Sequence, residues 1–232
     1  MSTLIRFENV TLGYEGQPVI KDLNFEVKTG DYLCVIGENG SGKSTMMKAL
    51  LGFLAPMSGS IEKDKSLKNA IGYLPQQQPS QADFPASVFE VVLSGCQGKK
   101  KTFSFYNAAD KRLASQNIEK MNISHLKNRS FKELSGGQKQ RTLLARAMCA
   151  AENLMLLDEP VSGLDPSATA ELYKTIEQLN KDGMTIIMIT HDIGHVSAAA
   201  SHVLKLGQTM QFFGPVEEYE KDTSKGGENQ WN

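Results

Sequence analysis

Long hydrophobic runs are missing from this sequence of 232 residues. The longest ones cover only residues 154–157 and 184–189, and a threonine interrupts the second. Because a membrane-spanning helix needs about 20 apolar residues, we expect no segment that crosses a bilayer. The N-terminal residues include an acid and no apolar core of signal-peptide length, so we expect no secretory leader either.

Cysteine is scarce, and charge of neither sign is in excess. Cys34, Cys96 and Cys149 are far apart and form no Cys-x-x-Cys pair, which favours reduced thiols in the cytosol. Lysine and arginine number 25 against 26 aspartates and glutamates, so no global field attracts nucleic acid. With 40% hydrophobic and 22% charged residues, the chain has the composition of a globular protein rather than a disordered one.

Apolar strands alternate with helical patterns along most of the chain. Strands are predicted at residues 4–12, 23–27, 31–36, 69–74, 153–157, 185–189 and 203–206. Helices are predicted at residues 43–53, 137–151, 167–181 and 193–200. The alternation indicates an α/β fold with a mainly parallel sheet, while the first two strands flank a turn at residues 13–18 and suggest a separate hairpin.

The length fits one large domain with an insertion. The stretch from about residue 77 to 129 has few β-branched runs and several helical ones. We therefore predict a core at about 1–76 and 150–220, with a helical subdomain at about 77–149. Residues 221–232 are polar and contain glycine, which predicts a frayed tail.

A glycine-rich loop follows the strand at 31–36. Its sequence, Gly37-Glu38-Asn39-Gly40-Ser41-Gly42-Lys43-Ser44, fits the pattern G-x-x-x-x-G-K-[ST]. Glycines let backbone amides cradle phosphate oxygens, and the helix that begins here adds its positive dipole end. Lys43 would reach the β- and γ-phosphates and Ser44 would bind Mg²⁺. The context favours nucleotide binding over an inert turn, with candidate contacts at Gly37, Asn39, Gly40, Ser41, Gly42, Lys43, Ser44 and Thr45.

Two acids end the apolar strand at 153–157. Carboxylates at the end of a buried strand are costly unless a cation or ligand meets them. Asp158 suits Mg²⁺ binding, and Glu159 suits orienting or deprotonating an attacking water. An exposed turn is the alternative; it explains Pro160 but not the pair of acids.

The pentapeptide Leu134-Ser135-Gly136-Gly137-Gln138 could be a simple helix start capped by Ser135. As a string of five residues, however, it has a very low chance frequency. On this pentapeptide and the phosphate loop, the chain resembles the ATP-binding subunit of an ABC transporter over residues 3–215. The resemblance implies a P-loop NTPase core, an N-terminal antiparallel β part and an inserted helical subdomain.

The resemblance also implies roles for residues outside these motifs. Tyr14 would stack on adenine, although an aromatic residue in a turn is an ordinary alternative. Gln76, with the register open because Gln77 and Gln78 follow, would contact Mg²⁺ and water and sense the membrane partner. Asp165 would lie in a loop that crosses a dimer interface, and His191 would contact the γ-phosphate. Ser135, Gly136, Gly137 and Gln138 would contact nucleotide held by a second subunit.

The family works as an assembly, so partners are implied as well. We expect a head-to-tail homodimer that sandwiches two ATP molecules with Mg²⁺. Separate transmembrane permease subunits are expected as direct partners, and an extracytoplasmic substrate-binding protein as an indirect one. The expected location is the cytoplasmic face of a bacterial cell membrane. No nucleic acid partner is expected.

Residues 83–95 carry a hint about cargo. Asp83-Phe84-Pro85-Ala86-Ser87-Val88, followed by Val91, Val92 and Gly95, is similar to a segment in the ATPases of zinc and manganese importers. Importers of iron-siderophores and vitamin B12 share part of this pattern and stay open as alternatives. An iron–sulfur assembly ATPase and a non-enzymatic binding module are further alternatives. A zinc protease is disfavoured because Asp192 stands where the pattern His-Glu-x-x-His requires glutamate.

Overall fold

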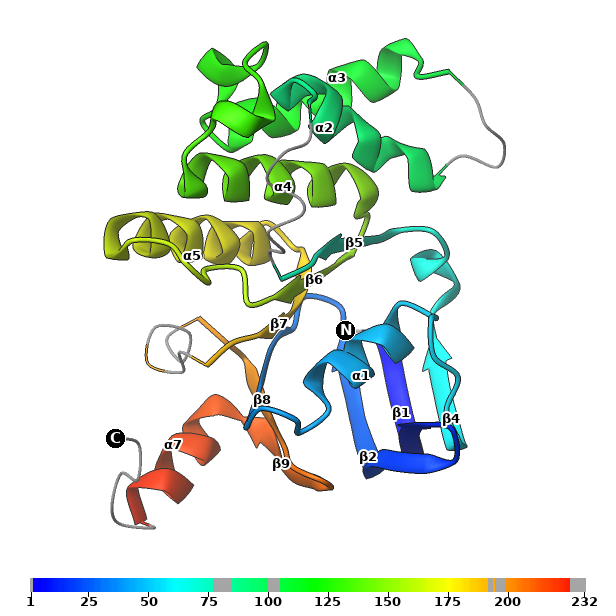
Figure 1. The fold of residues 1–232 in the computed structure, drawn as a ribbon. Helices are drawn as coiled ribbons and strands as arrows, with labels where there is room; N and C mark the ends of the chain where they lie inside the picture. The colour runs from blue at the N-terminus through cyan, green and yellow to red at the C-terminus, as the bar shows by residue number, and fades with distance from the viewer. Residues whose placement is uncertain (1, 77–84, 100–104, 192–193, 195–198, 226–232) are drawn as a thin grey trace. The chain divides into compact units, whose positions relative to one another are not determined.

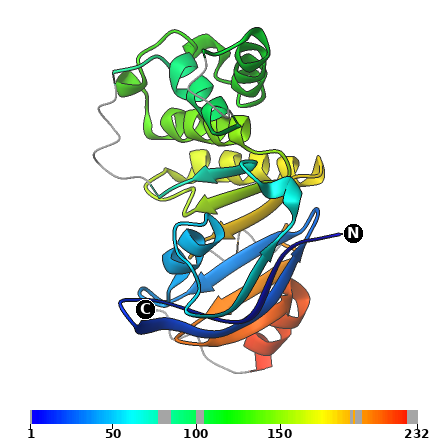
Figure 2. The same cartoon turned by 90° about the vertical axis from the view of Figure 1, so that its right-hand side faces the viewer.

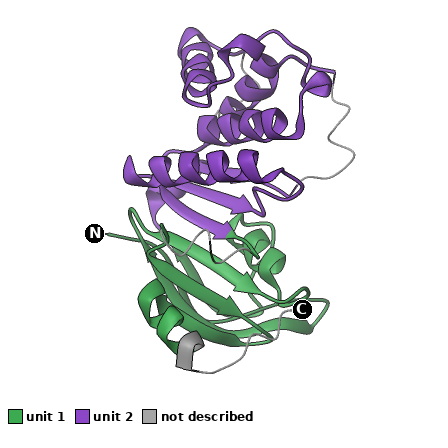
Figure 3. Ribbon diagram, turned by 90° about the vertical axis from the view of Figure 1, so that its left-hand side faces the viewer, with its two compact units in different colours: residues 1–63, 189–232 green, residues 64–188 purple. Residues whose placement is uncertain are grey.

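The computed structural model describes residues 2–76, 85–99, 105–191, 194 and 199–225. These form two compact units, residues 1–63 with 189–232, and residues 64–188 (Figure 3). Among the described residues, none of the helices combines the length and the hydrophobicity of a transmembrane span. The predicted core and helical subdomain are divided at other residues than these two units are. That division of the chain therefore stays a prediction.

The first unit contains an antiparallel sheet in the order β2-β1-β4, made by β1 (Thr3–Tyr14), β2 (Gln17–Lys28) and β4 (Ser58–Lys63) (Figure 2). Glu15 and Gly16 join β1 to β2 with φ of 51° and 79°, which is the backbone of a tight hairpin turn. The predicted hairpin is confirmed. Strand β4 was not predicted, because Ile61 is its only apolar residue.

Strand β3 (Tyr32–Gly37) pairs in parallel with β8 (His202–Leu206), which pairs antiparallel with β9 (Met210–Pro215). The chain then forms helix α7 (Val216–Lys225), so the expectation of a frayed tail beginning at residue 221 is wrong for its first five residues. Acidic residues in the first turn favour this helix, and its buried residues include Val216 and Tyr219.

Helix α1 (Lys43–Leu50) begins directly after the glycine-rich loop. The predicted helix extended to residue 53, but Gly52 has φ of 81° and ends it earlier. The amide of Phe53 donates to the carbonyl of Lys48 at 2.8 Å, a common way of closing a helix C-terminus. The Nζ of Lys63 also donates to the carbonyls of Ala49 and Leu50.

The second unit contains β5 (Ile71–Leu74), β6 (Leu154–Asp158) and most of β7 (Thr185–Ile189), in this spatial order. Every residue of β6 and β7 is buried, as expected for strands of a parallel sheet covered on both faces. Helices α4 (Gly136–Ala150) and α5 (Pro166–Lys181) lie side by side near these strands (Figure 1). Gly72 permits close packing, because a Cβ there would lie 2.5 Å from the carbonyl oxygen of Ala147.

The remaining named elements of this unit are α- or 3₁₀-helices, and all but the first lie in the stretch that was predicted to be helical. They are η1 (Lys65–Leu67), α2 (Val88–Ser94), η3 (Gly95–Lys99), α3 (Ala108–Lys120), η4 (Ser124–Leu126) and η5 (Phe131–Glu133). Ser87 with Glu90, and Asn107 with Asp110, form capping boxes that start α2 and α3. Both helices pack against α4. Phe84 of the cargo motif and most of the predicted helix at 193–200 lie outside the described residues.

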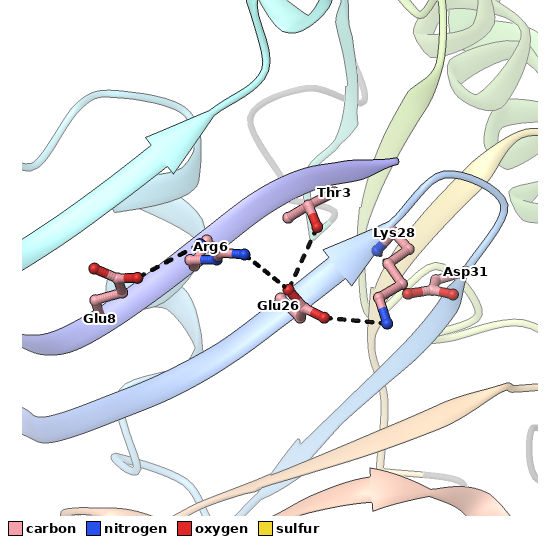
Figure 4. Close-up of polar contacts among 6 residues, drawn as sticks. All are labelled: Thr3, Arg6, Glu8, Glu26, Lys28 and Asp31. Carbon is pink, nitrogen blue, oxygen red and sulfur yellow. Dashed lines mark hydrogen bonds and ion pairs between the residues drawn. The ribbon is translucent and has the colours of Figure 1, made fainter. Parts of the chain in front are cut away.

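Strands β1 and β2 carry a group of surface ion pairs (Figure 4). Arg6 lies 3.4 Å from Glu26 and 3.7 Å from Glu8, and Lys28 lies 3.1 Å from Glu26. These side chains are largely exposed to water. Exposed pairs contribute about 0–1 kcal/mol each, so the group has little effect on the fold and offers no site for chemistry.

Candidate nucleotide-binding and hydrolysis site

The loop between β3 and α1 has a backbone that only glycine tolerates at several positions. Gly37, Gly40 and Gly42 have φ of 153°, 83° and 94°. A Cβ on Gly37 would lie 2.4 Å from the carbonyl oxygen of Leu206, and one on Gly42 would lie 2.3 Å from Ile20. The predicted glycines therefore shape a tight loop at the start of α1, as phosphate binding requires.

Two buried polar side chains of this loop have the arrangement expected for a ligand-binding loop. Ser41 is 7% exposed, and its Oγ has no hydrogen-bond partner among the described residues. Lys43 is also 7% exposed, and its Nζ donates to the carbonyls of Gly37 at 2.7 Å and Glu38 at 2.9 Å. Because buried polar groups are normally satisfied, the unpartnered hydroxyl indicates that an anion completes this loop.

A pocket of about 970 Å³ adjoins the loop. Residues 36–41, together with Thr190, His191 and residues of β8 and β9, line it. The structure thus brings His191 to the same pocket as the loop, although 150 residues separate them in the chain. The amide of Thr190 donates to the carbonyl of Val35 at 3.2 Å, which fixes the backbone just before His191.

Tyr14 lies at the end of β1 and is 41% exposed. Its phenol oxygen accepts a hydrogen bond from Lys48 at 3.2 Å, and the same ammonium lies 5.3 Å from the ring centre. The pKa of Tyr14 is lowered, first by a hydrogen bond with Thr45 and then by Lys48. Residues of α1 therefore orient this ring, leaving it accessible to a flat partner.

In the second unit, two predicted residues meet at the end of β6. The Nε2 of Gln76 donates to Oε2 of Glu159 at 2.7 Å. Glu159 has φ of 47°, a left-handed conformation that costs about 1–3 kcal/mol for a residue other than glycine. Strain of this kind often accompanies function, and here it aims a carboxylate from the strand end.

Asp158 is buried, with 8% of its surface exposed. It accepts a hydrogen bond from Tyr73 of β5, a strand that pairs in parallel with β6. Burial, followed by the negative charge of Asp158, raises the pKa of Tyr73 to about 12. The phenol therefore stays protonated and holds the carboxylate in place.

The pentapeptide begins α4, also in the second unit. The hydroxyl of Ser135 accepts from the amide of Gln138, and the Gln138 side chain accepts from the amide of Ser135 at 3.1 Å. Asp165 caps α5 in a similar way, accepting from the amide of Ala168 at 2.9 Å. These groups line one pocket of about 550 Å³, with Gly136, Gly137, Arg141 and Glu171. The structure thus brings Asp165 to the pentapeptide.

The residues expected to hold Mg²⁺ offer suitable atoms. Ser44 supplies an exposed hydroxyl in the first unit, while Asp158 and Gln76 supply carboxylate and amide oxygens in the second. Oxygen ligands of this kind are those that Mg²⁺ prefers, so the donor set fits. Within the described ranges, no group of three or more His, Cys, Asp or Glu residues is arranged to hold a metal ion.

Comparison with known proteins gives the family. The model described as "ABC transporter" matches residues 20–162, and the chain belongs to this family of ATP-binding ATPases. It is 35% identical, over 95% of its length and 89% of the relative's, to the zinc uptake system ATP-binding protein ZurA of Listeria innocua. It is 34% identical to the manganese transport system ATP-binding protein MntB of Bacillus subtilis, covering 92% of this chain and 87% of MntB.

A solved structure gives the same result for the fold. A metal-chelate type ABC transporter in an inward-facing conformation aligns with a TM-score of 0.84 and 35% identity, over 94% of this chain and 85% of that one. This confirms the predicted P-loop NTPase fold with a mainly parallel sheet, an antiparallel part and helices inserted into it.

Some residues near the site had no signal in the sequence. Tyr73 and Lys48 contact Asp158 and Tyr14, but neither belongs to a motif. Their contacts depend on strand pairing and on helix packing, which spacing in the chain does not reveal. Gln140 follows the pentapeptide by two residues, and the sequence pattern predicted only that it lies in a helix.

Proposed function

We propose that this chain is the ATP-hydrolysing subunit of an ABC importer that takes up a divalent transition metal, zinc or manganese, through a separate permease. The observation that carries the nucleotide part is the loop in which Ser41 Oγ has no partner within the described part of the chain and Lys43 donates to backbone carbonyls. The metal part is supported by ZurA and MntB, which match nearly the full chain and are named for zinc and manganese.

The loop amides and Lys43 bind the phosphates. Lys43 leaves the carbonyls of Gly37 and Glu38 and moves its ammonium to the phosphate oxygens, a stronger charge-assisted contact. Tyr14 stacks on the base. The nucleotide contacts are Gly37, Asn39, Gly40, Ser41, Gly42, Lys43, Ser44 and Thr45. Ser44, Gln76 and Asp158 would hold Mg²⁺, which would supply positive charge to neutralise the phosphates.

Glu159 orients and deprotonates the attacking water, and His191 donates to the γ-phosphate. The Nε2 of Gln76 donates to Oε2 of Glu159, which orients the carboxylate while it keeps further acceptor capacity for water. A positioned general base contributes about 10²–10⁴-fold to a rate.

A second copy of the chain completes the site. The pentapeptide residues Ser135, Gly136, Gly137 and Gln138, at the positive end of α4, face the γ-phosphate held by the partner, and Asp165 lies at the interface. Two sites are equivalent in such a homodimer. Hydrolysis removes the bridging contacts, the subunits separate, and permease subunits at the cytoplasmic face of a bacterial membrane move with them. A binding protein outside the cell delivers the metal.

Iron chelates are a second candidate cargo, because YfeB of Yersinia pestis, 36% identical over 90% of this chain, is named for chelated iron transport. Zinc and manganese are favoured, because ZurA and MntB match nearly the full chain and are named for these metals.

The test is reconstitution of the chain with the permease that co-purifies with it, in proteoliposomes. We expect ATP-dependent uptake of radioactive zinc or manganese, and none with Glu159→Gln. The surface variant Glu8→Gln, which changes one exposed carboxylate, serves as the control and should transport normally. Uptake of iron-siderophore alone would replace the metal assignment, and co-purification with ribosomes in place of a membrane protein would overturn the transport assignment.

A further inference from the structure

Gln140 is a buried amide that no part of the site above uses. It lies on α4, two residues after the pentapeptide, and is 2% exposed. Its Nε2 donates to the carbonyl oxygen of Pro160 at 2.5 Å. Pro160 follows Glu159 directly, so the helix that carries the pentapeptide is bonded to the backbone next to the proposed general base.

The segment that receives this bond is a tight turn. The carbonyl of Glu159 accepts from the amide of Ser162 at 3.1 Å, and Pro160 at the second position of the turn has its φ fixed by its ring. Glu159 itself has φ of 47°. A backbone in this region persists only where its surroundings hold it, and the hydrogen bond from Gln140 is a buried contact that does so.

We propose that Gln140 is a positioning residue for ATP hydrolysis, whose amide holds the Glu159–Ser162 turn and thereby aims the carboxylate of Glu159. The bond also links the pentapeptide to Glu159 within one subunit. A shift of α4 when the pentapeptide meets nucleotide would reach the Pro160 carbonyl through a single side chain. This inference rests on the proposed role of Glu159.

The first experiment replaces the amide by an apolar chain of similar size, Gln140→Met, in the full-length protein. We expect the ATPase kcat to fall about tenfold, because a buried carbonyl loses its donor and the turn relaxes. Affinity for ATP should stay within about twofold, since Gln140 lies outside the phosphate loop. If the Met variant does not fold, Gln140→Asn keeps a polar side chain but withdraws the donor by one methylene.

Asn117→Leu is the matched control. Asn117 is also buried, at 4% exposed, and also donates to α4, but to Sγ of Cys149 near the C-terminal end of that helix. It should lower the melting temperature as Gln140→Met does and leave kcat unchanged. An equal loss of kcat in Asn117→Leu would mean that Gln140 acts only through the stability of α4.

Two further measurements separate positioning from a general structural role. In a Glu159→Gln background, Gln140→Met should change the residual single-turnover rate by less than about twofold, because both changes act through one carboxylate. Amide exchange should rise about tenfold in a peptide covering residues 159–165 and little elsewhere in the second unit. Additive rate losses, or exchange raised evenly over the unit, would overturn the proposal. Glu159→Gln at the parental rate would instead refute the proposed function.

Discussion

The phosphate loop in the first unit and the pentapeptide in the second both begin a helix, yet they treat their polar groups in opposite ways. In the loop, Ser41 Oγ has no partner among the described residues and Lys43 rests on backbone carbonyls. In the pentapeptide, Ser135 and Gln138 satisfy each other through a capping box. The loop thus keeps an unpartnered hydroxyl among the described residues, whereas the polar groups of the pentapeptide complete a helix cap.

This difference suggests separate roles for the two parts. An anion entering the loop could accept from the Ser41 hydroxyl, which has no partner among the described residues, so this hydroxyl gains a hydrogen bond without breaking one. Ser135 already accepts from Gln138, but its hydroxyl proton is still available to a ligand. In the proposed homodimer, its contribution depends on a nucleotide held by the other subunit. Substitutions in the two regions should separate binding from hydrolysis.

The largest effect is expected for Lys43→Met. It removes the ammonium that would meet the phosphates, and loss of one partner of a buried charge pair costs roughly 2–5 kcal/mol. We expect ATP affinity of the isolated chain to fall about 100-fold by equilibrium titration. Lys65→Met, at a lysine outside the loop, is the control. Unchanged ATP affinity in Lys43→Met would show that the loop does not bind the phosphates.

Ser135→Arg should have the opposite pattern to Lys43→Met: it should reduce hydrolysis and leave ATP binding to the monomer unchanged. A large cation at the tip of α4 would block the approach of a partner's nucleotide, so we expect hydrolysis to fall about 100-fold, the scale on which loss of a stabilising donor acts. ATP affinity of the monomer should be unchanged within about twofold. If monomer binding were lost as well, the pentapeptide would serve its own subunit's nucleotide.

A pair of alanine substitutions compares the glycine-rich loop and the pentapeptide by the free energy of unfolding. Ser41→Ala removes a buried hydroxyl for which the described residues offer no partner, so the free energy of unfolding should stay constant or rise by up to about 1 kcal/mol, while ATP affinity falls several-fold. Ser135→Ala removes a helix cap and should lower the free energy of unfolding by about 1 kcal/mol without changing ATP affinity of the monomer. Urea unfolding checks both. If Ser41→Ala lowered the free energy of unfolding more than Ser135→Ala does, the proposed difference between the two helix starts would be wrong.

Features of the fold and of the candidate site could be predicted from the sequence where all their residues lie in one continuous stretch of the chain. The glycine-rich loop, the two acids at the end of β6 and the buried strands are local, and the sequence predicted them. Strand β9 and helix α7 were missed, although Phe212 with Phe213 and the acids of α7 carried weak signals. The bond from Gln140 to Pro160 and that from Tyr73 to Asp158 join segments far apart in the chain. Only the packed structure reveals such contacts.

The smallest predicted effect concerns two tyrosines whose pKa values shift in opposite directions. In the first unit, hydrogen bonds with Thr45 and Lys48 lower the pKa of Tyr14; in the second, burial and the charge of Asp158 raise that of Tyr73 from 10.0 to about 12. Above pH 10 an unfolded tyrosine loses its proton while Tyr73 keeps it, so folding is weakened as pH rises from 10 toward 12. Tyr14 ionises more easily when folded, so it adds stability as pH rises through its lowered pKa toward 10, and this gain stays constant above pH 10.

Tyr73→Phe should therefore reduce the drop in urea midpoint between about pH 9 and pH 11, and Tyr14→Phe should enlarge it. The comparison uses the change with pH rather than the absolute midpoint, because Tyr73→Phe also removes the hydrogen bond to Asp158 at every pH. Since Tyr14 is 41% exposed, water screens its contacts and its effect should be the weaker of the two. Shifts of the same sign in both variants would mean that the two environments do not differ as the structure describes.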